Sequence, residues 1–208
     1  MNFAATPTKT IRQLILGSTS RYRRDLLERL NIAFQVAAPD VDETPLPQEA
    51  PRVLAERLAL AKAKAVATRF PHAVVIGSDQ VADLNGQSLG KPGTHDKAVA
   101  QLRLMRGQTV VFQTAVAVVC RESGFEQHST AAVRVRFRDL TDDEIENYLR
   151  IEQPYDCAGS AKSEGLGIAL LDSIDSDDPT ALIGLPLIRT CQMLRAAGIE
   201  LLSKKAAS

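Results

Sequence analysis

The stretch from Ala73 to Gln80, with the sequence AVVIGSDQ, constrains the fold of this chain more than any other. It opens with four apolar residues, three of them β-branched, which predicts a short strand that is buried on both faces. We expect the strand to end at Gly77 and Ser78, so that Asp79 follows directly after it. Open α/β sheets place their ligand crevice at the carboxyl ends of such strands. Asp79 is therefore a candidate metal ligand or general base, and the alternative is a turn aspartate that bonds its own backbone.

The segments on both sides of this stretch alternate between strand-like and helical patterns. The other predicted strands lie at residues 13–16, 32–37, 109–120, 129–137 and 168–171. The predicted helices begin near Ser20, Arg52, Thr94, Thr141 and Pro186. Asn85-Gly86 is a hairpin signal, and the two long strands at 109–137 are predicted to pair antiparallel. Together these patterns predict an α/β fold with a mixed central sheet flanked by helices.

Size and composition narrow the possible classes of function. The 208 residues are enough for one domain with a proper core, and we expect residues 1–11 to be a disordered leader. Zero formal net charge and the absence of Trp argue against nucleic acid as a partner. No signal peptide or membrane-length apolar run is visible, and three scattered cysteines indicate a reducing compartment without a zinc site. We therefore expect a cytoplasmic protein that binds no membrane.

The turn after the first predicted strand is a candidate anion site. Small and hydroxyl residues fill positions 17–20, and Ser20 is a good N-cap for the helix that follows. Such a helix N-terminus offers free N–H groups to an anion. Three arginines lie at positions 21–24, where cations oppose the helix dipole, so a bound phosphate explains them better than helix stability does. A solvated basic surface is the alternative, because neither a Walker A loop nor a G-x-G-x-x-G motif occurs.

Two carboxylates and two lysines complete a candidate site for metal-assisted chemistry. Glu43 and Asp79 lie on separate predicted elements and offer the oxygen ligands that Mg²⁺ or Mn²⁺ prefers. Lys62, on a predicted helix, and Lys91, in a predicted loop, are candidates for contact with phosphate oxygens. Each lysine alone is more typical of a solvated surface. A phosphate clamp with carboxylates and lysines predicts phosphoryl or nucleotidyl chemistry.

Seven segments match one known family in order. They are LILGSTSRYRR, DVDETP, RLALAKAKA, IGSDQ, GKP, CAGSAKSEGLG and IGLPL. From residue 14 to residue 194 the chain closely resembles the Maf family of nucleoside triphosphate pyrophosphatases. The resemblance implies hydrolysis between the α- and β-phosphates of a nucleotide, with a divalent cation. It also implies an elongated, two-lobed structure with a central cleft, similar to inosine-triphosphate pyrophosphatases, and a homodimer.

The resemblance assigns roles to individual positions. Asp79 matches the family's catalytic acid, which accepts the proton of the attacking water. Glu43, Asp79 or both would hold the metal. The positions that hold the triphosphate and the metal are Ser18, Arg23, Glu43, Lys62 and Lys91.

Three further positions, Tyr22, Gln80 and Glu164, separate the branches of the family. The branch that acts on dTTP and UTP typically carries Arg, Thr and Gln there, whereas the branch that acts on 7-methyl-GTP carries an aromatic residue, Gln and Glu. This chain resembles the second branch, with Tyr22 in place of the more usual Trp. N7-methylation makes guanine cationic, and an aromatic face attracts a cation, while Glu164 can accept from the guanine edge. The predicted substrate is 7-methyl-GTP.

Three alternatives compete with this hypothesis. The same chemistry on dTTP, UTP or other non-standard nucleotides is disfavoured by Gln80 and Glu164. A nucleotide-binding regulator of cell division is disfavoured by Asp79, because a binding module has no need of an acid that activates water. Nucleic-acid binding rests only on the arginines at 21–24 and is disfavoured by the balanced charge.

Overall fold

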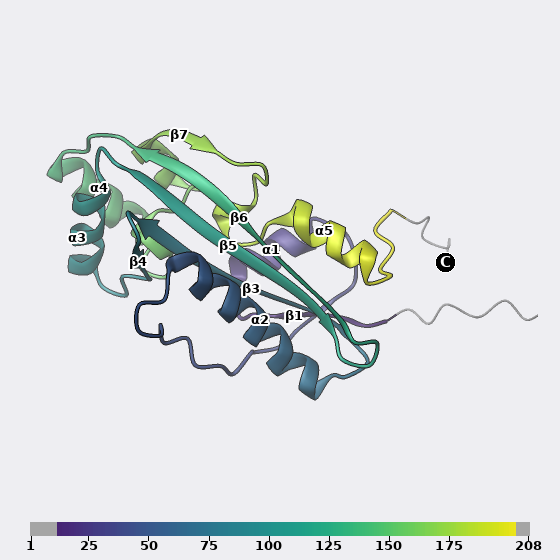
Figure 1. Cartoon of the computed structure of the whole chain (residues 1–208). Coiled ribbons are helices and arrows are strands. Elements are labelled where there is room, and N and C mark those ends of the chain that lie inside the picture. The colour runs from purple at the N-terminus through teal and green to yellow at the C-terminus, as the bar shows by residue number, and fades with distance from the viewer. Residues whose placement is uncertain (1–11, 203–208) are drawn as a thin grey trace, which may run out of the picture.

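The computed structural model describes residues 12–202. These residues form one mixed sheet of seven strands with helices on both faces, in an elongated molecule (Figure 1). The predicted α/β class with a helix-flanked mixed sheet is therefore confirmed. The predicted leader, residues 1–11, lies outside the described residues, and the assignment of the whole chain to one domain stays a prediction.

Twelve helices and strands, together with three short 3₁₀ turns, follow one another along the chain. The strands are β1 (Leu14–Gly17), β2 (Gln35–Val36), β3 (Val74–Leu84), β4 (Gln87–Leu89), β5 (Thr109–Cys120), β6 (Phe125–Phe137) and β7 (Leu171–Asp175). The α-helices are α1 (Arg21–Glu28), α2 (Pro51–Arg69), α3 (His95–Met105), α4 (Asp142–Glu152) and α5 (Leu187–Ala196). The 3₁₀ turns are η1 (Ala158–Ser160), η2 (Leu166–Leu170) and η3 (Ala181–Ile183).

The sheet has the strand order β2-β1-β3-β5-β6-β7, and β4 also pairs with β3. β1 runs parallel to both β2 and β3. The remaining pairs are antiparallel, and the longest ladder joins β5 to β6. β3 is therefore the strand at which the pairing changes. Its partner β1 is parallel to it, and its partners β4 and β5 are antiparallel.

Three of the five predicted helix starts are confirmed by capping contacts. Ser20, Thr94 and Thr141 each accept a hydrogen bond from the backbone N–H three residues further on. The Thr141 backbone N–H in turn donates to the Glu144 carboxylate, which completes a capping box. Pro186 immediately precedes α5, and the predicted turn at Asn85-Gly86 joins β3 to β4. These signals hold because each depends on a few neighbouring residues.

The predicted end of the strand at Gly77 and Ser78 is wrong. β3 continues to Leu84, because antiparallel β5 pairs with it from Val75 to Asp83 and supplies hydrogen bonds across the glycine and the polar residues. Asp79 consequently lies in the middle of a long strand, with 7% of its surface exposed, and not in a turn after a short one.

Three other strands differ from the prediction by more than one residue at an end. β2 is limited to Gln35–Val36, the residues that pair with β1. β6 begins at Phe125, four residues early, because its ladder with β5 extends to the hairpin turn. β7 begins at Leu171, since the preceding residues form η2.

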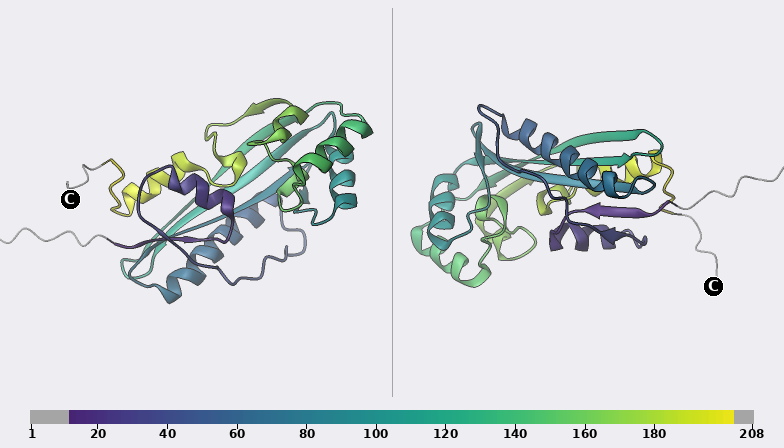
Figure 2. Two further views of the ribbon diagram at one scale, coloured as in Figure 1. Left: turned by 180° about the vertical axis from the view of Figure 1, so that it is seen from behind. Right: turned by 90° about the horizontal axis from the view of Figure 1, so that it is seen from below.

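The sheet separates two layers of helices (Figure 2). α2 covers one face, where it packs on residues such as Val75 and Ala117. α1 and α5 cover the other face, where Ile76 and Val116 point, as expected from the alternation of side chains along a strand. A separate cluster at the far end of the long strands joins α3 and α4 to β4, β5 and β6. β3, β5 and β6 thus extend from one core region, packed between α2 and the α1–α5 layer, to a second core region beneath α3 and α4. The segments that connect these two core regions line the site.

A glycine sets the distance between α2 and β3. A Cβ atom at Gly77 would lie 2.3 Å from the carbonyl oxygen of Ala59 and 2.5 Å from the backbone nitrogen of Ala63. Only glycine fits at this approach. Because the helix backbone lies directly on the strand here, Lys62 of α2 reaches Asp79, two residues further along β3.

Candidate active site

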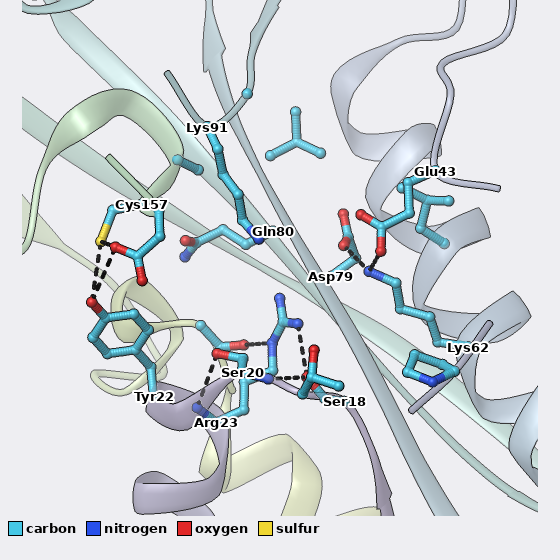
Figure 3. Close-up of a pocket in the computed structure, with 18 of the residues that line it drawn as sticks. Ser18, Ser20, Tyr22, Arg23, Glu43, Lys62, Asp79, Gln80, Lys91 and Cys157 are labelled. Carbon is cyan, nitrogen blue, oxygen red and sulfur yellow. Dashed lines mark hydrogen bonds and ion pairs between the residues drawn. The ribbon is translucent and has the colours of Figure 1, made fainter. Parts of the chain in front are cut away.

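A large pocket lies at a gap in one edge of the sheet, and residues of β3 at this gap line it. β1 pairs with residues 74–77 of β3, and β4 pairs with residues 82–84 of the same edge, while β5 occupies the other edge. Within the described residues, 78–81 have no strand partner on this edge. The pocket at the gap encloses about 1070 Å³, and its walls come from both core regions (Figure 3). This volume is at the upper end of the usual range for small-molecule sites.

Asp79, Lys62 and Glu43 form a carboxylate–ammonium–carboxylate group in this pocket. Lys62 Nζ lies 2.7 Å from Asp79 Oδ1 and 2.8 Å from Glu43 Oε1. Lys62 is 4% exposed, whereas the Glu43 side chain is 56% exposed. Partial burial acts to raise the pKa of Glu43, but the Lys62 ammonium outweighs it and holds that pKa below its ordinary value. The structure thus brings these three predicted residues together and pairs Lys62 with both carboxylates.

The two carboxylates could hold a divalent cation. Each uses one oxygen on Lys62, and within residues 12–202 no hydrogen bond or ion pair engages Glu43 Oε2 or Asp79 Oδ2. No cluster of three or more acidic, His or Cys side chains suited to a metal occurs in that range either. Mg²⁺ is usually bound by one or two carboxylates and completed by waters and substrate phosphates. The donor set of Glu43 and Asp79 fits such an ion.

The turn after β1 contributes a fixed cation. Arg23 Nε donates to the Gly184 carbonyl at 2.8 Å, and its Nη1 donates to Ser18 Oγ at 3.3 Å. Burial lowers the pKa of Arg23, while Asp79 and Glu43 act to raise it; a guanidinium stays charged in any protein environment. Lys91 extends into the same pocket from the opposite wall (Figure 3). One cavity thus brings together Ser18, Arg23 and Lys91, which were predicted from separate segments, and anion binding there stays a prediction.

The other two arginines of the cluster have different surroundings. Arg24 is exposed and pairs with Asp25 and Glu28 on the surface of α1. The Arg21 guanidinium carbon lies 4.7 Å from the centre of the Tyr22 ring, and its Nη2 donates to Tyr22 Oη at 2.7 Å. The Tyr22 ring is thus already in contact with one cation, the Arg21 guanidinium.

Tyr22 lies in the part of the pocket remote from Lys62 (Figure 3). Glu164 lines the same pocket, and its charge acts on Cys157, a neighbour of Tyr22. Tyr22 Oη lies 3.4 Å from Asp156 Oδ1 and 3.7 Å from Cys157 Sγ. Partial burial raises the pKa of Tyr22 to about 12 and that of Cys157 to about 11. Sequence reasoning missed Asp156 and Cys157 as neighbours of Tyr22, although Cys157 opens the CAGSAKSEGLG segment that it had singled out.

Gln80 lies on the opposite face of β3 from Asp79 and holds the pocket wall. Its amide nitrogen donates to the carbonyls of Ala181 and Leu182 at 2.9 and 3.0 Å, and to Thr114 Oγ1 at 3.0 Å. Since carbonyl oxygens only accept, the side-chain NH₂ must face them. Gln80 therefore ties η3 to the sheet beside the cavity.

Known proteins resemble this chain over nearly its whole length. The family model described as Maf-like protein matches residues 13–197. A protein of Polaromonas sp. (strain JS666 / ATCC BAA-500), named 7-methyl-GTP pyrophosphatase, is 77% identical over 97% of this chain and 92% of its own. Proteins with the same name from Albidiferax ferrireducens and Burkholderia pseudomallei are 70% and 62% identical, over 92% and 91% of this chain and 96% and 89% of their own. The chain belongs to the Maf family.

Proposed function

We propose that this protein hydrolyses 7-methyl-GTP to 7-methyl-GMP and pyrophosphate. Relatives at 62–77% identity carry the name of that activity. The single observation that carries the proposal is that one pocket contains three groups of residues. The carboxylate–lysine group around Lys62, the fixed Arg23, and an aromatic ring with a further carboxylate all line it. The first group suits activation of the reacting water, the second suits binding of the triphosphate, and the third suits recognition of a cationic base.

Asp79 acts as the general base in this proposal. Its position in the middle of β3 and its bond to Lys62 fix the carboxylate, as a general base requires. Asp79 takes a proton from water while the water oxygen bonds to phosphorus, and the phosphorus–oxygen bond to the leaving pyrophosphate breaks. Arg23 and Lys91 hold phosphate oxygens and place the anhydride near Asp79.

Glu43 and Asp79 are the residues that would hold a divalent cation, Mg²⁺ or Mn²⁺. When bound, such an ion supplies charge stabilisation at the phosphate oxygens. Lys62 keeps the two carboxylates from repelling one another and fixes their orientation.

Tyr22 and Glu164 recognise the base. An aromatic ring favours the cationic 7-methylguanine over a neutral pyrimidine, and a carboxylate accepts from the donors on the guanine edge. A pyrimidine carbonyl facing Glu164 would place acceptor against acceptor, which lowers affinity. Gln80 contributes through η3, which it holds against the sheet, and not through a cationic or aromatic contact.

The partner in this proposal is a nucleotide. Among residues 12–202, none of the helices combines the length and the apolar character needed to cross a bilayer. The homodimer, the cytoplasmic location and the lack of nucleic-acid binding stay predictions.

The test is pyrophosphate release from 7-methyl-GTP, GTP, ITP, dTTP and UTP with Mg²⁺, Mn²⁺ or EDTA. We expect metal-dependent turnover with 7-methyl-GTP as the preferred substrate. The Asp79→Asn variant should remain folded by circular dichroism and lose about 10²- to 10⁴-fold in kcat on every substrate, the usual contribution of a general base. Preference for dTTP or UTP would contradict the assignment of the base pocket. No turnover on any nucleotide would favour the division-regulator hypothesis, and an active Asp79→Asn variant would place the base elsewhere.

A further inference from the structure

The loop that carries Glu164 is tied to α4 at several points. The Lys162 ammonium pairs with the Glu152 carboxylate, and the Leu166 backbone N–H donates to Glu152 Oε2 at 2.8 Å. Tyr148 Oη donates to the Ser160 carbonyl at 3.2 Å and accepts from the Lys162 backbone N–H at 3.1 Å. Glu152 and Tyr148 lie one turn apart on α4, so a single helix holds the loop on both sides of Glu164.

The loop is closely fitted around the Glu152 carboxylate. A Cβ atom at Gly165 would lie 2.7 Å from Glu152 Oε2, and one at Gly167 would lie 2.5 Å from the Lys162 carbonyl oxygen. The Glu152 side chain is only 13% exposed, and that of Lys162 is 24% exposed. Gly165 permits the approach of the Glu152 carboxylate, and Gly167 permits the close approach of the loop backbone at Lys162.

Glu164 itself has no such partner. Within residues 12–202 no hydrogen bond or ion pair engages its carboxylate, although it lines the pocket. Lys162 is two residues away and feels its charge, because Glu164, after Glu152, contributes to raising the pKa of Lys162. Lys162 is thus the lysine nearest to Glu164 in the sequence, and its ammonium is engaged by Glu152 instead.

We propose that Glu152 is a positioning residue for base recognition, because it holds Lys162 away from Glu164 and so leaves the Glu164 carboxylate free for a cationic base. The inference rests on the proposed function, in which Glu164 reads the base. A lysine released from Glu152 would pair with Glu164, neutralise the pocket wall and reduce the attraction for 7-methylguanine. If the Glu152–Lys162 ion pair were purely structural, the loss of substrate preference on breaking it would not depend on the charge of Lys162.

The experiment compares five variants by their ratio of kcat/KM for 7-methyl-GTP to that for UTP. Glu164→Gln sets the scale, and we expect it to lower the ratio about 10- to 100-fold, as loss of a charge-assisted hydrogen bond does. Glu152→Gln keeps an oxygen for the Leu166 N–H but cannot hold Lys162, and should lower the ratio about tenfold. Adding Lys162→Met to Glu152→Gln removes the competing cation and should restore the ratio to within about threefold of the parent.

Asp142→Asn is the matched control. Asp142 lies on the same helix and pairs with Arg103 and Arg106 on the exposed surface, outside the pocket. It should leave the ratio unchanged, and thermal melts of all variants report folding. If Glu152→Gln does not fold, Lys162→Met alone serves, and its ratio should stay within about twofold of the parent.

The outcomes separate the two proposals. If Glu164→Gln does not change the ratio in an active enzyme, the assignment of base recognition fails, and the role of Glu152 fails with it. If Glu164→Gln lowers the ratio and Glu152→Gln does not, only the role of Glu152 is overturned. A double variant as poor as Glu152→Gln, or a Lys162→Met loss as large as that of Glu164→Gln, would also overturn it.

Discussion

The two ends of the pocket are built differently. At the reacting end, Ser18, Lys62 and Asp79 are 4%, 4% and 7% exposed and come from the end of β1, from α2 and from β3. At the base end, Tyr22 is half-buried and Glu164 is exposed, and they come from the first turn of α1 and from a loop. Regular elements packed on a core hold a side chain more precisely than loops do.

This difference assigns separate tasks to the two ends. The chemical step requires a fixed base and fixed charges, which the buried carboxylate–lysine group provides. Base recognition can change through a few exposed side chains while the sheet stays the same. Substitutions at the reacting end should therefore reduce turnover on every nucleotide and lower stability, whereas substitutions at the base end should change substrate preference.

Among the variants that compare the two ends of the pocket, the largest effect should come from Lys62→Met. Removal of the buried ammonium leaves two carboxylates facing one another, so kcat/KM should fall about 10²- to 10³-fold on all nucleotides. The free energy of unfolding should fall by about 3 kcal/mol, as when one partner of a buried ion pair is deleted. Steady-state kinetics and urea denaturation measure the two effects. Lys64→Met on the same helix removes a half-exposed partner of Glu126 and serves as the control, with little change expected in either quantity.

The same variant has a predicted pH dependence. Because Lys62 holds the pKa of Glu43 below its ordinary value, the parent loses ionised Glu43 only as the pH falls through that lowered pKa. In Lys62→Met the pKa of Glu43 rises, so the acid limb of the kcat/KM profile should move to higher pH. An unmoved acid limb would show that Glu43 does not take part in the reaction.

A smaller and more selective effect is expected from Tyr22→Ala. Loss of the aromatic face should lower kcat/KM for 7-methyl-GTP about 2- to 30-fold, the range of cation–π contributions, and leave UTP nearly unchanged. Tyr22→Phe keeps the ring and should stay close to the parent. Equal losses on both substrates would remove the distinction between the two ends of the pocket, because Tyr22 would then serve turnover and not selection.

The smallest effect on catalysis should come from Cys157. Its pKa is raised to about 11 by burial, so the side chain is a thiol at neutral pH and becomes a thiolate only as the pH approaches that value. At pH 8, alkylation of Cys157 by iodoacetamide should be about a hundredfold slower than that of a cysteine with an ordinary pKa. Mass spectrometry of the modified residue measures the rate, and labelling as rapid as in the urea-unfolded chain would contradict the prediction. Cys157→Ser should keep activity within about twofold of the parent.

Sequence patterns predicted what depends on neighbouring residues. Ser20, Thr94 and Thr141 identified helix starts, since capping requires only the first turn of a helix. The order of the motifs predicted the family, which the family model and the relatives confirm. The mixed sheet followed from the alternation of strand and helix patterns, and strand limits were less accurate because they depend on the partner strand.

The sequence by itself determined which residue types were available for the chemistry, namely the carboxylates, lysines, arginine and aromatic residue of the motifs. Tertiary structure decided how they are paired. Lys62 and Asp79 are 17 residues apart, and Tyr22 and Asp156 are 134 residues apart, so no local pattern relates them. The gap between β1 and β4 on one edge of β3 exists only because distant strands share that edge. Long-range pairing with β5 placed Asp79 inside a strand, because the contacts of a side chain depend on which backbone segments pack together.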